Sequence, residues 1–340
     1  MCTAGIEWKR LRQWPKWRNE PVDLIHAGGE ILTYDAWDAA VMLFSPASQA
    51  CIARHGKTSD DRTAWARETL ETNALAPYVI GRETFAHAQS ISFDAAGGAS
   101  LASCDASLRA EALAKLRTAD RLSVRNAQTQ RALQAAGIDA PLSPDPATLT
   151  ATLFDDRIRA HANEGAVRDL RRTYPNGYLA VQFSVDFGDD ATLADIAHQL
   201  SQIDLGVVLF RAGAVPWHDD LDVYARLASK LTEAQCFESL NIWDICALIA
   251  SSAGYAGSSL HGRIVAMAYG LPRINLLHPD DAARTGKQSA YAATWEPADM
   301  PGAVPIGQLA SALKETLALD RVVLKQLASN LVRNDSSRYR

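Results

Sequence analysis

The chain has 340 residues, of which 48% are hydrophobic, and its formal net charge is −5. This length is enough to bury a large core and predicts two domains. The mildly acidic balance excludes a global electrostatic attraction to nucleic acid. Five cysteines are scattered without the spacing of metal ligands, and no apolar run nears the roughly 18 residues that span a bilayer. We therefore expect a soluble cytoplasmic protein with reduced thiols and no metal site.

The N-terminal segment, residues 1–20, places Trp8, Trp14 and Trp17 among five lysines and arginines. Interleaved indoles and cations suit a membrane interface, which would make the protein peripheral at the inner membrane face. In the alternative, the tryptophans dock on the protein while the charges face water. We favour docking because Pro15 interrupts a continuous amphipathic helix.

The first half of the chain alternates between predicted strands and helices. A short apolar strand at residues 22–25 leads into Gly28 and Gly29, and further strands are predicted at 78–80 and 121–125. The last of these runs into a helix with Asn126 near its start. The glycine pair has two interpretations: it presents backbone N–H groups to a ligand, or it forms a tight turn that needs positive φ.

The alternation restarts after a helical, charged stretch, so we place a domain boundary near residue 165. Strands are predicted at 178–185, 205–211, 253–259 and 273–277, with helices between them and one or two helices at the end. This pattern indicates βαβ units and parallel sheets. We predict an N-terminal α/β domain over 21–165 and a C-terminal one over 166–340. Both would be Rossmann-like and doubly wound, with a ligand cleft between them.

The stretch "YAGSSLHGRIVAMAYGLP" brings Ser258 and Ser259 to the carboxyl edge of the second predicted sheet, where either serine can cap the next helix. His261 and Arg263 follow in the first turn. A cation at a helix N-terminus is unfavourable unless an anion is also there, so the pattern favours a negatively charged ligand. The alternative is a core helix, with a structural His261 and an Arg263 paired to a surface acid.

Three blocks of the sequence resemble the polysaccharide pyruvyl transferase family, in the same order as in that family. They are "DLIHAGGEIL", "LSVRNAQTQRALQAAGIDAPLSPDP" and "IASSAGYAGSSLHGRIVAMAYGLPRINLL", and the resemblance extends from about residue 20 to about residue 300. It implies a GT-B-like fold. It also implies transfer of a pyruvyl group from phosphoenolpyruvate to two hydroxyls of one sugar, giving a cyclic ketal, without a cofactor. The acceptor would be a sugar or lipid-linked oligosaccharide used in polysaccharide, for example exopolysaccharide, biosynthesis.

The resemblance also implies roles for individual residues. His261 matches the family's histidine and would be the catalytic acid, since histidine has an unperturbed pKa near neutrality. Donor-binding residues would be Arg125, Arg211, Ser258, Ser259, Arg263 and Lys287, of which Arg211 rests on topology more than on a motif. Acceptor-binding residues would be Gly28, Gly29 and Glu30.

The sequence departs from the family pattern at two places. Many members have arginine where this chain has Ser259, so Arg263 would have to supply the missing charge. Members also begin with an additional strand and a Gly/Asn-rich loop. Either an altered acceptor-binding side of the first domain or a truncated N-terminus would account for that difference.

Two acidic features have alternative interpretations. We expect Asp145 to fix a loop through an Asx-type turn before Pro146. The run "HDDLD" at 218–222 suits helix capping better than a metal site. Two other functions also stay open: a GT-B glycosyltransferase that uses a nucleotide sugar, and a non-catalytic member that binds a glycan or a partner enzyme.

Overall fold

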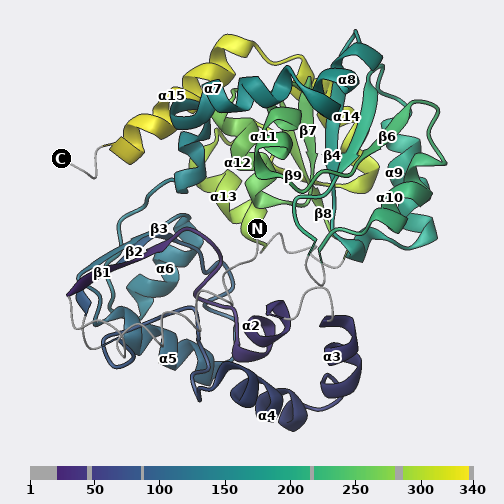
Figure 1. Ribbon diagram of the computed structural model, residues 1–340. Helices are drawn as coiled ribbons and strands as arrows, with labels where there is room; N and C mark the ends of the chain where they lie inside the picture. Colours follow the sequence, from purple (N-terminus) through teal and green to yellow (C-terminus); the bar gives the residue numbers. More distant parts are fainter. Residues whose placement is uncertain (1–20, 44–47, 86–87, 215–217, 280–285, 337–340) are drawn as a thin grey trace. The chain divides into compact units, whose positions relative to one another are not determined.

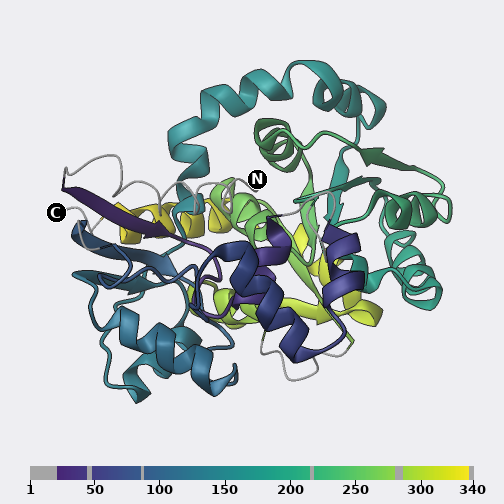
Figure 2. The same ribbon diagram turned by 60° about the horizontal axis from the view of Figure 1, so that its bottom comes forward.

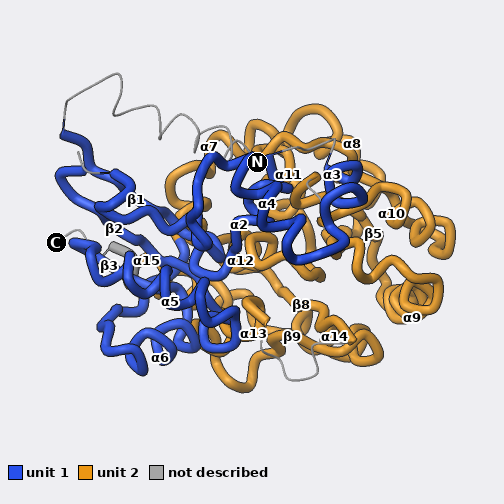
Figure 3. Tube along the Cα trace, turned by 90° about the horizontal axis from the view of Figure 1, so that it is seen from below, with its two compact units in different colours: residues 1–145 blue, residues 146–340 orange. Residues whose placement is uncertain are grey.

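The structure is a computed structural model that describes residues 21–43, 48–85, 88–214, 218–279 and 286–336. The tryptophans of the N-terminal segment therefore lie outside the described residues. The chain forms two compact units, Met1–Asp145 and Pro146–Arg340 (Figure 3). We had expected the boundary near residue 165. It falls earlier because helix α7 (Thr150–Ala162) contributes Ile158 and Ala162 to the core of the second unit.

The first unit contains a parallel three-stranded sheet in the order β1-β2-β3 (Figure 1). Its strands are β1 (Val22–Ala27), β2 (Ala88–Ala96) and β3 (Arg121–Val124). Helices α2 (Ala36–Met42), α3 (Ser48–His55) and α4 (Ser59–Leu70) follow one another between β1 and β2, as the dark purple and indigo segments of Figures 1 and 2 show. Helices α5 (Ala106–Leu116) and α6 (Ala127–Ala135) precede and follow β3.

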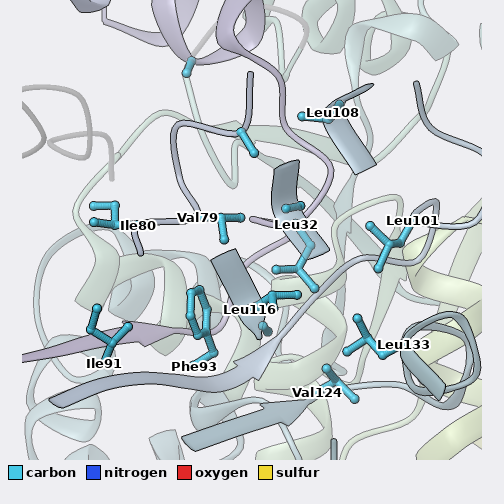
Figure 4. Packing of buried hydrophobic residues seen from close by; sticks show 14 of the residues in the cluster. Leu32, Val79, Ile80, Ile91, Phe93, Leu101, Leu108, Leu116, Val124 and Leu133 are labelled. Atoms are coloured by element: carbon cyan, nitrogen blue, oxygen red, sulfur yellow. The ribbon is translucent and has the colours of Figure 1, made fainter. Parts of the chain in front are cut away.

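The central strand of this sheet, β2, was not among the predicted strands. Its side chains alternate: Ile91 and Phe93 are buried in the core, where Figure 4 shows them near Val79 and Ile80, while Ser92 between them is partly exposed. The prediction of a strand at 78–80 was wrong. Those residues form a turn in which the Val79 N–H donates to the Ala76 carbonyl, so their apolar character reflects burial and not strand pairing.

The second unit contains a parallel six-stranded sheet in the order β6-β5-β4-β7-β8-β9 (Figure 1). Its strands are β4 (Tyr178–Gln182), β5 (Gly206–Phe210), β6 (Ala234–Phe237), β7 (Gly254–Gly257), β8 (Arg273–Leu277) and β9 (Ala303–Pro305). The chain adds strands on one side of β4 and then reverses to add the others from β7 onward. This is the Rossmann strand order, and the reversal between β4 and β7 is its switch point.

Helices cover both faces of this sheet, because alternate side chains of β4 belong to two different cores. Leu179 and Val181 pack with helices of one face, whereas Tyr178 and Ala180 pack with helices of the other. The first face carries α9 (Asp190–Leu200), α10 (Leu221–Ala228) and α14 (Leu309–Leu317). The second carries α7, α8 (Gly165–Thr173), α11 (Ile242–Ala250) and α12 (Leu260–Ala268).

The predicted α/β architecture with parallel sheets is confirmed. The structure also contains α13 (Lys287–Trp295) and α15 (Arg321–Ser336). Among the helices of the described ranges, none has the length and apolarity needed to cross a membrane. The GT-B-like arrangement of the units and a cleft between them stay predictions.

Candidate functional site

The glycine pair after β1 forms a tight turn against β2. Gly28 and Gly29 have φ values of 59° and 75°, in the left-handed region that glycine adopts without strain. The Gly28 N–H donates to the Asp94 carbonyl, and the Gly29 carbonyl accepts from the Gly97 N–H. The tight turn with positive φ is therefore confirmed. Binding of a ligand by the backbone N–H groups of this pair stays a prediction.

Arg125, at the end of β3, lies in the core of the first unit. Its guanidinium donates to Glu30 at 2.7 Å and to Asp145 at 2.9 Å, and only 1% of its side chain is exposed. Burial alone would lower the pKa of Arg125, but the two carboxylates raise it, so the group stays charged. The prediction that Arg125 binds the donor does not fit this position. The structure instead joins three residues of the sequence motifs into one buried ion cluster, in which Glu30 and Asp145 are the partners of Arg125.

Gly97, which no sequence pattern had singled out, allows this cluster to form. A Cβ atom at Gly97 would lie 2.5 Å from the Gly29 carbonyl oxygen and 2.6 Å from Nε of Arg125. Neither backbone nor a buried guanidinium can yield that much space. The available signal was the pair Gly97 and Gly98 after an alternating run, the same strand-to-glycine pattern that marked Gly28 and Gly29.

At the switch point of the second unit, Ser258 and Ser259 build the turn between β7 and α12. The Ser258 N–H donates to the Gln182 carbonyl at 3.0 Å, and Ser258 Oγ accepts from the Ser184 N–H at 2.9 Å. Ser259 is the N-cap of α12, because its Oγ accepts from the Gly262 N–H at 3.2 Å. The predicted cap is confirmed. Both hydroxyl oxygens thus accept hydrogen bonds from backbone N–H groups, and donor binding by these two serines stays a prediction.

Arg263 does not lie at this edge. Its side chain is fully buried and donates to Glu296, to Asn275 Oδ1 at 3.2 Å and to the Gly302 carbonyl at 3.1 Å. Glu296 also accepts from Arg273 Nε at 2.5 Å. Burial would raise the pKa of Glu296, but the two arginines lower it, so the carboxyl is ionised. The prediction that Arg263 binds the donor is therefore replaced by a structural role in the core.

Two helix N-termini meet at the carboxyl edge of this sheet. His261 is exposed on the first turn of α12. Lys287 begins α13, and the next residue, Gln288, donates from its amide to the Ser258 carbonyl. Because a helix N-terminus carries a partial positive charge, this edge attracts an anion.

His218, after β5, interacts electrostatically with Lys287. Burial lowers its pKa, the charge of Lys287 lowers it further, and Asp186 opposes both effects. Asp220 accepts from the Asp222 N–H at 2.8 Å and caps α10, as predicted for the "HDDLD" run. Within the described parts of the chain, no three His, Cys, Asp or Glu side chains are placed to hold a metal ion.

Asp219 is a buried carboxylate that sequence reasoning did not single out from its run. It accepts from Gln182 Nε2 at 2.6 Å and from the Ala212 N–H at 2.5 Å. Burial raises its pKa to about 6, against the opposing effect of these two hydrogen bonds. Arg211, the predicted donor ligand after β5, lies half-buried nearby and its charge favours the ionised form of Asp219.

The model of the polysaccharide pyruvyl transferase family matches residues 5–280. This chain belongs to the polysaccharide pyruvyl transferase family. It is therefore a transferase of polysaccharide pyruvylation in the general sense of that family. No curated protein matches the chain by sequence.

The solved structures to which this chain is similar include two epimerases. UDP-N-acetylglucosamine 2-epimerase from Rickettsia bellii is 10% identical over 94% of this chain and 97% of its own, with a TM-score of 0.49. UDP-GlcNAc 2-epimerase from Methanocaldococcus jannaschii, in complex with UDP-GlcNAc and UDP, is 12% identical over 87% of this chain and 93% of its own, with a TM-score of 0.49. Similarity at this level carries no information on the activity of the pyruvyl transferase family member described here.

Proposed function

We propose that this protein transfers a pyruvyl group from phosphoenolpyruvate to two hydroxyls of one sugar, in a surface polysaccharide or its lipid-linked precursor. The observation that carries the proposal is the exposed position of His261 on the first turn of α12, at the switch point of the second sheet. Lys287 begins the helix that contacts the same turn through Gln288. A donor with a phosphate and a carboxylate suits an edge that combines two helix N-termini with an ammonium group.

The chemistry needs a proton donor at one carbon of the phosphoenolpyruvate. In the proposed reaction, the imidazolium of His261 protonates the methylene carbon, which leaves positive charge at the adjacent carbon. One sugar hydroxyl attacks that carbon and loses its proton. The carbon–oxygen bond to phosphate then breaks, and the second hydroxyl closes the ketal. Overall, one hydroxyl proton ends on the new methyl group and the other on the departing phosphate.

The donor-binding set of this proposal differs from the set predicted by sequence. Lys287 and Arg211 stay in it, and His218 joins them because it shares the electrostatic environment of Lys287. Arg125 and Arg263 leave it, since both are buried in ion clusters. A cytoplasmic location, the absence of a cofactor and a peripheral membrane contact through Trp8, Trp14 and Trp17 belong to the same proposal.

The test is an assay of phosphate release from phosphoenolpyruvate with galactose-, glucose- and mannose-containing acceptors, with the acid-labile ketal detected by mass spectrometry. We expect His261→Ala to lower kcat by about 10²–10⁴-fold, the usual contribution of a general acid. His198→Ala is the matched control, because His198 is exposed on α9. Full activity of the His261 variant would refute its catalytic role. Thermal stabilisation by a nucleotide sugar but not by phosphoenolpyruvate would refute the choice of donor.

A further inference from the structure

A chain of hydrogen bonds runs from Asp219 through Gln182 to the first turn of α12. Asp219 accepts from Gln182 Nε2 at 2.6 Å, and Gln182 Oε1 accepts from the Ser259 N–H at 2.8 Å. Both Gln182 and Asp219 are buried, with 2% and 8% of their surface exposed. Such buried polar groups stabilise one geometry only while every donor meets an acceptor.

The orientation of the Gln182 amide is set by Asp219. The second oxygen of Asp219 already accepts from the Ala212 N–H at 2.5 Å, and an ionised carboxylate has no proton to donate. The Gln182 amide must therefore turn its NH₂ group toward Asp219. Its oxygen then faces the Ser259 N–H, which needs an acceptor because it has none in the helix that follows.

The same turn is also held by Tyr255, whose hydroxyl oxygen lies 3.2 Å from the Ser259 N and 3.3 Å from Gln182 Oε1. Its hydroxyl donates to the Ser259 carbonyl at 3.0 Å, and the side chain is fully buried. A Cβ atom at Gly262 would lie 2.7 Å from the Tyr255 ring, so only glycine lets the ring reach this place. Leu260 and His261 lie between Ser259 and Gly262, so the backbone of His261 is held through both of these residues.

We propose that Asp219 and Gln182 are positioning residues that hold the first turn of α12, and with it His261, in the orientation that the reaction requires. The catalytic part of this inference rests on the proposed function. The positioning part rests on the hydrogen bonds alone and can be tested without any substrate.

The test exchanges the donor and the acceptor of the hydrogen bond between residues 219 and 182. In Asp219→Asn, the one side-chain oxygen stays with the Ala212 N–H, and the new NH₂ group faces Gln182. Gln182 must then flip and place its own NH₂ group against the Ser259 N–H, so that two buried donors face each other and the Ser259 N–H keeps only its longer contact, 3.2 Å, with the Tyr255 hydroxyl oxygen. In the double variant Asp219→Asn/Gln182→Glu, both carboxylate oxygens of residue 182 accept, one from Asn and one from the Ser259 N–H. The double variant has the same net charge as the wild type.

We expect Asp219→Asn to speed hydrogen–deuterium exchange in peptides that cover residues 258–263. We also expect it to lower kcat for phosphoenolpyruvate by about 10–100-fold, as the loss of one buried hydrogen bond implies. The donor KM should change much less, since Lys287 is untouched. The double variant should recover both exchange protection and kcat to within about threefold. Asp220→Asn is the control, because Asp220 is adjacent but caps α10 and does not contact Gln182.

The outcomes separate this inference from the proposed function. Unchanged exchange and unchanged kcat in Asp219→Asn would overturn it, and so would a double variant that fails to recover. Loss of folding in both variants would also overturn it and make Asp219 a residue of the fold. If exchange rises and is restored by the double variant while the wild type does not turn over phosphoenolpyruvate, the positioning role stands and the proposed donor is wrong.

Discussion

Three arginines of this protein, Arg125, Arg263 and Arg273, have fully buried side chains. A buried guanidinium is tolerated only when a carboxylate and further acceptors replace its water shell. Arg263 and Arg273 share one carboxylate, that of Glu296; burial lowers the pKa of Arg273, and the charge of Arg263 lowers it further. Glu296 is thus the residue on which this part of the core depends.

We predict that Glu296→Ala lowers the free energy of unfolding of the second unit by about 3–5 kcal/mol, the usual cost of leaving buried charges without their partner. Urea denaturation followed by circular dichroism measures this change. Glu315→Ala, on the exposed surface of α14, is the control and should change stability by less than about 0.5 kcal/mol. Equal stabilities for the two variants would show that the arginines find other partners.

The same arginines mark the limit of prediction at the residue scale. The sequence correctly predicts a serine cap on the helix after β7, which the structure places at Ser259, since caps are local. The direction in which a guanidinium points, in contrast, is not determined by the residues next to it in the sequence. The partner of Arg125 at Glu30 is 95 residues away, and the partner of Arg263 at Glu296 is 33 residues away. Only the folded chain shows that both side chains are buried in ion clusters.

At the scale of elements, His26 connects two strands and a turn of the first unit. Its Nε2 accepts from the Ile80 N–H at 3.1 Å, its Nδ1 lies 3.2 Å from the Ser92 carbonyl oxygen, and its ring stacks on Phe93 at 4.0 Å. Accepting the Ile80 N–H requires a neutral ring. Burial lowers the pKa of His26 to about 4, against the hydrogen bond to Ser92, which raises it.

This pKa gives the first unit a pH dependence with a defined sign. Between pH 6.5 and pH 4 the unfolded chain binds a proton at His26 while the folded chain does not, so stability is lost as the pH falls. The loss amounts to about 3 kcal/mol. We predict that His26→Gln is less stable than the wild type at pH 7 and that this difference shrinks by about 3 kcal/mol at pH 4, measured by urea denaturation. A difference that stays constant with pH would contradict the neutral state of His26, and His198→Gln serves as the exposed control.

Elements that combine a clear period with local end signals were predicted well. β8 has the predicted bounds, and β5, β7 and helix α6 were also found, because strand runs and caps are written in adjacent residues. Two short strands at the edges of the second sheet, β6 and β9, were not predicted. Their sequences, AQCF and AVP, show no run of strand-forming residues, and their pairing with β5 and β8 defines them.

At the scale of the whole molecule, the division after Asp145 coincides with the division between hydrophobic cores. The core of the first unit contains residues from Leu32 to Ile138 and Ala140, and the cores of the second contain residues from Ile158 onward, with Ala147 packed against one of them. Composition and alternation predict two units, but they cannot assign the connecting helix α7. Its assignment depends on which core receives its apolar face.

The last prediction tests that assignment with two fragments, residues 146–340 and 166–340. Helix α7 packs on α11 through the edge contact of Phe154 with Trp243, through Arg157 placed 4.2 Å over the same indole, and through His161, whose ring lies 2.6 Å from Asp244. The shorter fragment loses these contacts and exposes the apolar face of α11.

We expect the longer fragment to unfold in one cooperative thermal transition. The free energy of unfolding of the shorter fragment should be lower by at least about 3 kcal/mol, the order of burying two apolar side chains, or the fragment should aggregate. Calorimetry and size-exclusion chromatography measure both effects. Equal melting of the two fragments would place α7 outside the second unit and return the boundary to near residue 165.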